Sequence, residues 1–219
     1  MYEGVSYINL GLAGIFIGFV IIAFIPPKVI DLDVYIKTII SYQSSLNNMV
    51  KALNLEGNPV FIPSYEDLPN GGIFIPKYKN FSINLGMFDE ETFLVNGGGI
   101  LITPPIGYRF IEDFEDYSDI KLKETDLGLA ISVASSVLKI FGLVEGIDFE
   151  EKNESIKIIV ENLKVQYNGY KIPCPIISSI VYLVSLSLNQ LIYIENIKKE
   201  ENYIEINLKK LGSVDEHLW

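Results

Sequence analysis

The residues of this chain with the clearest chemical potential are one cysteine and one arginine. Cys174 lies between two prolines at the expected start of a helix, where the helix dipole would lower the pKa of its thiol. No histidine lies near it in the sequence, so a buried structural cysteine is the other interpretation. Arg109 follows Tyr108 and could hold a carboxylate or phosphate with its guanidinium group, or pair with an acidic residue beyond it. Cys174, Arg109 and Tyr108 are candidate ligand-binding residues, and no base or orienting group completes a catalytic set.

Other kinds of site are not predicted. With one cysteine and one histidine, His217, the chain cannot assemble a metal site of His and Cys ligands. The acidic run from Glu112 to Asp119 lacks the spacing of an EF-hand and is expected to be a solvated charged segment. The glycine run at 97–99 is not followed by Lys-Ser/Thr, so it predicts a turn rather than a phosphate loop. The sequence therefore predicts no cofactor and no metal.

The charge of the chain excludes nucleic acid as a partner. The formal net charge is -11 at pH 7, and the chain contains a single arginine. Binding to phosphates requires a basic surface that displaces their counterions, and no lysine-rich face is visible here.

An uncharged segment near the amino terminus predicts a membrane anchor. Ile8 to Ile25 contains no charged residue and, after a flank at residues 1–7, is long enough to be read as a transmembrane helix. A cleaved signal peptide is disfavoured because no basic residue precedes the segment. Lys28 and Lys37 follow it, so the positive-inside rule places the remainder in the cytoplasm, with the anchor in the cell membrane as a single pass. Three glycines on one face could pack against a second anchor, or reflect the frequency of glycine in membrane helices: Gly11, Gly14 and Gly18.

Residues 31–54 predict one amphipathic helix, a stalk between the anchor and the folded region. The segment contains no glycine or proline, and apolar residues recur at alternating spacings of three and four. This is the pattern of a heptad seam formed by Ile36, Ile39, Gln43, Leu46, Val50 and Leu53. The seam could pair with the same helix of another copy, giving a homo-oligomer, or the helix could lie on its own domain.

The rest of the chain predicts an α+β fold. Residues 57–126 read as β-hairpins with glycine-rich turns. Residues 127–211 contain two similar units at an offset of about 48 residues, and each unit reads as helix, strand, turn and strand. Two such units predict a four-stranded antiparallel sheet with both helices on one face, followed by a polar tail at residues 212–219.

The order of helices and strands in residues 127–208, with Cys174 at the mouth of the second apolar helix, resembles the small-molecule-binding domains of the vinyl reductase type. That family's paired cysteines are not present, so the resemblance implies the fold and not the ligand. The layout of anchor, IFIPKY, ILITPPIGYRFIEDFE and IPCPIISSI resembles uncharacterised single-span membrane proteins of methanogenic and salt-loving archaea. This second resemblance implies membrane attachment and no activity.

Together these features predict a membrane-anchored cytoplasmic module that binds a ligand or another protein and self-associates. Two alternatives stay open: a thiol-based sensor or enzyme that uses Cys174, and an accessory subunit of a larger membrane complex.

Overall fold

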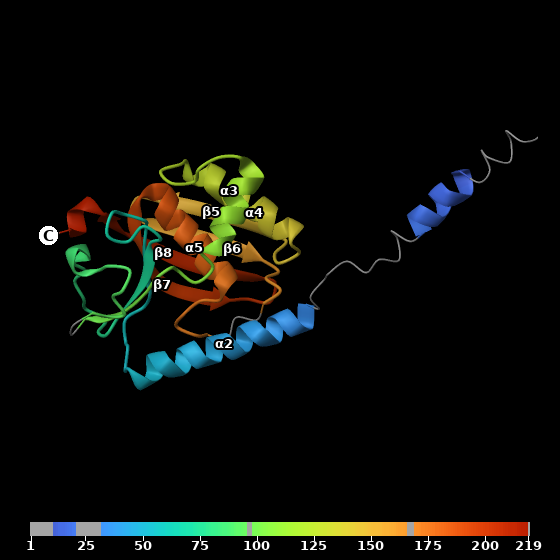
Figure 1. The fold of residues 1–219 in the computed structure, drawn as a ribbon. Coiled ribbons are helices and arrows are strands. Elements are labelled where there is room, and N and C mark those ends of the chain that lie inside the picture. The colour runs from blue at the N-terminus through green and yellow to red at the C-terminus, as the bar shows by residue number, and fades with distance from the viewer. Residues whose placement is uncertain (1–10, 21–31, 96–97, 166–168, 219) are drawn as a thin grey trace, which may run out of the picture. The chain divides into compact units, whose positions relative to one another are not determined.

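The computed structural model describes residues 11–20, 32–95, 98–165 and 169–218, and the chain divides into two units, Met1–Tyr35 and Ile36–Trp219 (Figure 1). In the first unit, residues 11–20 are helical and their large apolar side chains are exposed. No helix in the described ranges is both long enough and apolar enough to cross a membrane. The prediction of a transmembrane helix at residues 8–25 is therefore not supported by the described residues. Residues 8–10 and 21–25 of that segment lie outside the described ranges.

The three glycines of that segment, Gly11, Gly14 and Gly18, lie in the helical part. A methyl group placed on any of them would meet no other atom within 4 Å. Pairing of this stripe with a second copy stays a prediction.

One antiparallel sheet of eight strands forms the centre of the second unit, in the order β3-β4-β2-β1-β7-β8-β6-β5. The strands are β1 (Val60–Ile62), β2 (Gly72–Pro76), β3 (Leu94–Val95), β4 (Gly99–Ile102), β5 (Gly146–Lys152), β6 (Ser155–Glu161), β7 (Gln190–Lys199) and β8 (Tyr203–Ser213). The predicted four-stranded sheet is wrong, because β1 pairs with β7 and joins the two sets of hairpins. Val60 lies opposite Tyr193, and Phe61 lies opposite Ile192.

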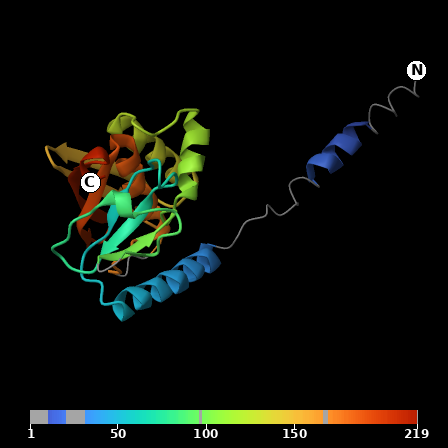
Figure 2. The ribbon, with the colours of Figure 1, turned by 60° about the vertical axis from the view of Figure 1, so that its left-hand side comes forward.

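Helices cover one face of this sheet (Figures 1 and 2). α4 (Leu127–Ile140) packs against β5, α5 (Pro175–Leu188) packs against β1 and β7, and α3 (Arg109–Ser118) packs on both helices. α5 is buried along nearly its whole length, as expected of an uncharged core helix. α3 was not predicted: the acidic run forms a helix whose Ile111 and Phe114 are buried, while Glu112, Asp113 and Asp116 are exposed.

The two predicted units form the half of the sheet that ends at β5. Each consists of a helix and a hairpin, α4-β5-β6 and α5-β7-β8. β6 and β8 pair in the middle, and Ile158 lies opposite Ile206, the residue 48 positions further along the chain. An approximate two-fold axis between these two residues therefore relates the units.

The opposite face of the sheet is covered only in part. Over β1, β2 and β4, loop residues close an apolar cluster that includes Leu68, Leu85 and Phe88, and Val214 of the carboxyl-terminal segment joins it. The predicted polar tail is thus anchored, and Nε2 of His217 lies 2.9 Å from the carbonyl oxygen of Leu211. Strand residues alternate between the two faces, and over β5, β6 and β8 most of the outward side chains are polar.

An ion pair at the centre of this polar face predicts acid sensitivity. Lys157 Nζ lies 2.7 Å from Glu205 Oε2, and Asn207 donates a hydrogen bond to Glu205 Oε1. These bonds lower the pKa of the Glu205 carboxyl to about 2. In the unfolded chain a glutamate has a pKa of about 4.3, so the pair contributes stability above that pH and loses it as the pH falls through the folded value.

We expect Glu205→Gln to lower the melting temperature at pH 7, and the difference from the wild type to shrink steadily between pH 5 and pH 2. Thermal unfolding monitored by circular dichroism measures this. Glu154→Gln, which removes a carboxylate from an exposed turn, is the matched control. A constant difference across this range would show that the ion pair does not stabilise the fold.

Candidate functional site

The residues singled out from the sequence do not form one site. The Arg109 side chain is 82% exposed, and its Nη1 lies 2.7 Å from Oε1 of Glu112, one turn along α3. The pairing with a neighbouring acid is therefore what the structure shows. Tyr108 immediately precedes α3 and makes no side-chain capping hydrogen bond, and its ring lies against that of Tyr182 in α5. Cys174 lies at the start of α5 but is fully buried.

Burial makes the Cys174 thiol a poor nucleophile. Removal from water raises the pKa of the thiol to about 11, although backbone N–H groups at the start of α5 oppose the shift. We expect iodoacetamide to leave Cys174 unmodified at neutral pH in the folded protein and to modify it fully in denaturant. Mass spectrometry measures the extent, with glutathione in the same tube as the reactive control. If iodoacetamide modified Cys174 in the folded protein as fast as it modifies glutathione, the interpretation of the protein as a thiol-based sensor or enzyme would be favoured again.

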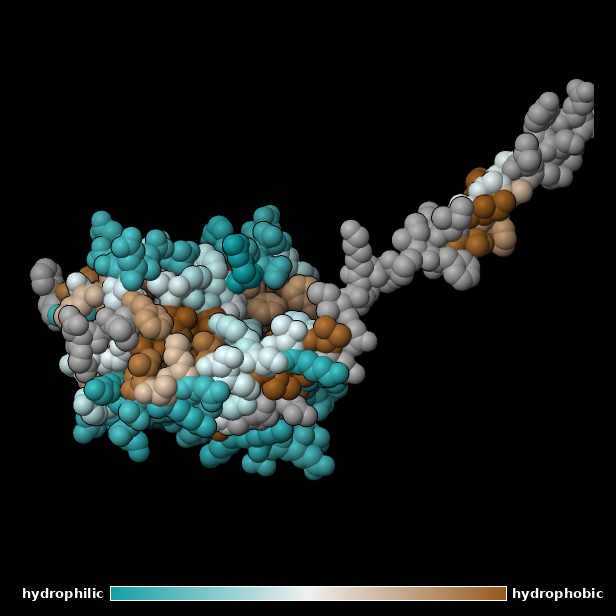
Figure 3. Space-filling model, turned by 60° about the horizontal axis from the view of Figure 1, so that its bottom comes forward, coloured by the Kyte–Doolittle hydropathy of each residue, from teal (hydrophilic) through white to brown (hydrophobic). Residues whose placement is uncertain are grey.

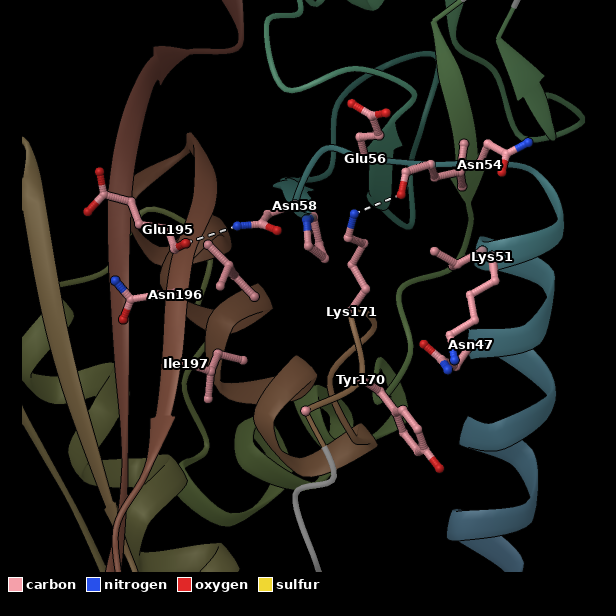
Figure 4. Close-up of a pocket in the computed structure, with 15 residues that line it drawn as sticks. Asn47, Lys51, Asn54, Glu56, Asn58, Tyr170, Lys171, Glu195, Asn196 and Ile197 are labelled. Atoms are coloured by element: carbon pink, nitrogen blue, oxygen red, sulfur yellow. Dashed lines mark hydrogen bonds between the residues drawn. The ribbon is translucent and has the colours of Figure 1, made fainter.

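A groove lies between α2 (Leu32–Ala52) and the second half of β7, and we call it the α2–β7 groove (Figure 4). Its volume is about 620 Å³. Apolar residues gather in a band between polar rims on the face shown in Figure 3. The lining comes from four segments: α2, the chain after it, the loop before α5, and β7. It consists of Asn47, Val50, Lys51, Asn54, Leu55, Glu56, Asn58, Pro59, Gly169, Tyr170, Lys171, Ile194, Glu195, Asn196 and Ile197.

Main-chain hydrogen bonds hold the wall formed by α2. The helix ends at Ala52, Asn54 turns the chain with a φ of 51°, and Leu55 after it is buried. The next two residues then bond to the end of β2: Glu56 N donates to Lys77 O, and Gly57 N donates to Pro76 O. The Tyr170 hydroxyl, from the loop before α5, shares a hydrogen bond of 3.1 Å with Ser44 of α2. The groove is therefore bounded by segments that are tied together.

Lys171 is the central polar group of the groove (Figure 4). Its ammonium donates a hydrogen bond of 2.7 Å to Leu55 O, and it makes no ion pair with any described residue. Burial lowers the pKa of Lys171 below its ordinary value; the Glu56 carboxylate opposes this shift and Lys79 adds to it. The ammonium has three donors, so two remain for a ligand.

Amide side chains surround this lysine. Asn58 donates a hydrogen bond of 2.9 Å to Glu195 O and so extends the contact between β1 and β7 beyond Pro59. Asn47, Asn54 and Asn196 also line the groove, and amides can both donate and accept. The site can hold a ligand that has an anionic group and further hydrogen-bonding atoms.

The seam predicted for self-association faces the folded region in part. Ile39, Gln43 and Val50 are each at most 7% exposed, and Oε1 of Gln43 has no hydrogen-bond partner. Ile36 and Leu46 are half-buried, and Leu53 is exposed just after the end of the helix. This is the arrangement expected of a helix lying on its own domain. Self-association through the remaining surface stays a prediction.

Comparison with known proteins places the chain in a family. The model of the family described as Domain of unknown function (DUF7982) matches residues 7–206, which is most of the chain. The chain belongs to the DUF7982 family. No curated protein and no solved structure matches this DUF7982 chain. Its function must therefore be argued from the geometry of the α2–β7 groove.

Sequence reasoning missed this groove in the DUF7982 chain. Lys171 stands alone in a loop, and Asn47 and Asn54 read as the polar side of an amphipathic helix. These residues follow no common sequence spacing, because their four segments are brought together only in the folded sheet, in which β1 pairs with β7. Only the buried seam residue Val50 belongs both to a predicted set and to the groove.

Proposed function

We propose that the folded region is a binding module that holds an anionic, hydrogen-bonding ligand in the α2–β7 groove. The observation that carries this proposal is Lys171, an ammonium that is half-buried and lacks a carboxylate partner among the described residues. Removing a cation from water without an opposite charge is costly, and a bound anion would offset that cost. The amides around it would then select the neutral part of the ligand.

The order of elements in residues 127–208 also favours a binding function. We also propose that residues 127–208 are related to small-molecule-binding domains of the vinyl reductase type. Such a relationship would agree with a ligand groove bordered by β7. Archaeal origin also remains a proposal. Location at a membrane, with the folded region in the cytoplasm, and self-association are separate predictions, which fractionation and cross-linking of the full chain would test. The thiol-based and accessory-subunit alternatives have no comparable observation behind them.

Titration with small anions tests the proposal. Inorganic phosphate, citrate and succinate are added in turn, and the melting temperature and the NMR signal of the Lys171 side chain are followed. We expect at least one anion to raise both the melting temperature and the pKa of Lys171, because the anion favours the charged form. A charge-assisted hydrogen bond contributes about 1.5–3 kcal/mol, so Lys171→Met should weaken binding about tenfold or more.

Lys123→Met is the matched control, since Lys123 also bonds to a main-chain carbonyl, that of Ser64, but lies outside the groove. It should leave anion binding unchanged. Equal loss in both variants, or no response of Lys171 to any of the anions, would contradict the proposal.

A further inference from the structure

We infer that β5 is a docking edge for an extended basic segment of another protein, which adds to the sheet as a further antiparallel strand. This site is distinct from the α2–β7 groove. β5 is the outermost strand: it pairs with β6 along all of Gly146–Lys152, and no described strand lies on its other side.

The direction of the free main-chain groups follows from one hydrogen bond. Ile147 N donates to Ser135 Oγ of α4 at 3.0 Å, so it points away from β6. Main-chain groups of alternate strand residues point to the same side. The N–H and C=O groups of Phe149 and Glu151 therefore also face outward. A partner strand would find a regular row of donors and acceptors there.

The approximate two-fold axis shows what fits such an edge. Ile147 lies opposite Val160, and Ile194 lies opposite Leu208; Val160 and Leu208 are 48 residues apart, so Ile147 and Ile194 are equivalent. In the second unit, Ile194 N donates to Pro59 O, immediately before β1. An extended strand therefore occupies the equivalent edge of β7.

In the first unit a serine hydroxyl takes the place of that strand. Beside it lies a groove of about 590 Å³ between α4 and residues 146–149 of β5, and Lys139 and Glu161 contribute to its rim. Equivalent strand residues, 194–197, line the α2–β7 groove. The duplication thus gives the protein two similar strand edges, one already paired with β1 and one open.

Charge identifies the partner. The exposed residues of β5 include Asp148, Glu150 and Glu151, and Glu161 lies beside Gly146. Glu150 and Glu151 already pair with Lys152 and Lys210, whereas Asp148 and Glu161 make no ion pair with any described residue. The charge available to a partner therefore lies at Asp148 and Glu161. The whole chain has a net charge of -11. A segment with lysine or arginine at alternate positions complements this edge, because opposite charges on neighbouring strands stabilise pairing.

A second copy of the chain fits the edge poorly. Antiparallel pairing of β5 with itself about Phe149 would place Asp148 opposite Glu150 on the same face. Like charges directly opposite each other destabilise a strand pair. The same acids protect the open edge from uncontrolled aggregation while leaving it accessible to a basic strand.

The test uses the full chain and a labelled ten-residue peptide that alternates lysine with valine. We expect saturable binding by fluorescence anisotropy that weakens as salt increases, and slower hydrogen exchange of the Phe149 and Glu151 amides. N-methylation of one set of alternate peptide residues should abolish binding, and N-methylation of the other set should leave binding nearly intact. The reason is that the peptide strand pairs with β5 through only one of its two edges. Asp148→Lys should weaken binding about tenfold, whereas Asp116→Lys on exposed α3 should not.

Binding that survives both methylation patterns would overturn the inference, as would equal binding of a peptide with glutamate in place of lysine. A dimer that protects the Phe149 and Glu151 amides without peptide would identify the occupant as a second copy and likewise overturn it. These outcomes do not depend on Lys171, so they are independent of the proposal for the α2–β7 groove.

Discussion

Replacement of Gly107 by alanine is expected to destabilise the protein by about 4 kcal/mol or more, which is a large part of the 5–15 kcal/mol that stabilises a typical domain. Gly107 has a φ of +83°, and a Cβ atom there would lie 2.1 Å from the carbonyl oxygen of Pro175. That oxygen belongs to the first turn of α5, which is buried between the sheet and α3 and cannot shift freely. Urea unfolding measures the loss.

Gly142→Ala is the control for this prediction. Gly142 has a similar φ of +69°, but a Cβ atom there would meet nothing within 4 Å. The conformational penalty alone should cost about 1 kcal/mol. Equal losses in the two variants would mean that the close approach of Gly107 to α5 does not exist.

Phe61→Ala is expected to cost about 3–5 kcal/mol, the range for removing a buried aromatic side chain. Phe61 is fully buried in β1 and lies opposite Ile192 of β7, so it supports the joint between the two sets of hairpins. We expect unfolding to remain a single transition, shifted to lower urea for every probe, because both sets share one sheet.

Phe141→Ala provides the comparison, since this phenylalanine is 47% exposed at the end of α4. Its truncation should cost about 1 kcal/mol or less. If Phe61→Ala instead produced two separate transitions, the strands of residues 60–102 would be an independent domain and the eight-stranded sheet would be wrong.

Local patterns were sufficient to predict most helices and strands. The stalk predicted at 31–54 corresponds to α2 at Leu32–Ala52, because a long segment without glycine or proline and with apolar residues at helical spacing has few other solutions. The glycine-rich turns separate β1 from β2 and β3 from β4. The helix α3 was missed because acids dominate its segment, although Ile111 and Phe114 have helical spacing.

Long-range pairing could not be predicted from the same patterns. All three residues of β1 are buried, so alternation gives no indication of which face or neighbour the strand has. The pairing of Phe61 with Ile192 depends on contacts between segments far apart in the sequence. The predicted four-stranded sheet failed for this reason, and the α2–β7 groove, which exists only once these segments have met, was missed with it.

The late position of β7 in the sequence also affects folding during synthesis. During synthesis, β1 and β2 leave the ribosome long before β7, to which β1 pairs. At about 5–20 residues per second, the early strands wait several seconds with an unpaired edge, and contacts this distant slow the search for the native pairing. The sheet should therefore be completed only after the carboxyl-terminal hairpin has emerged.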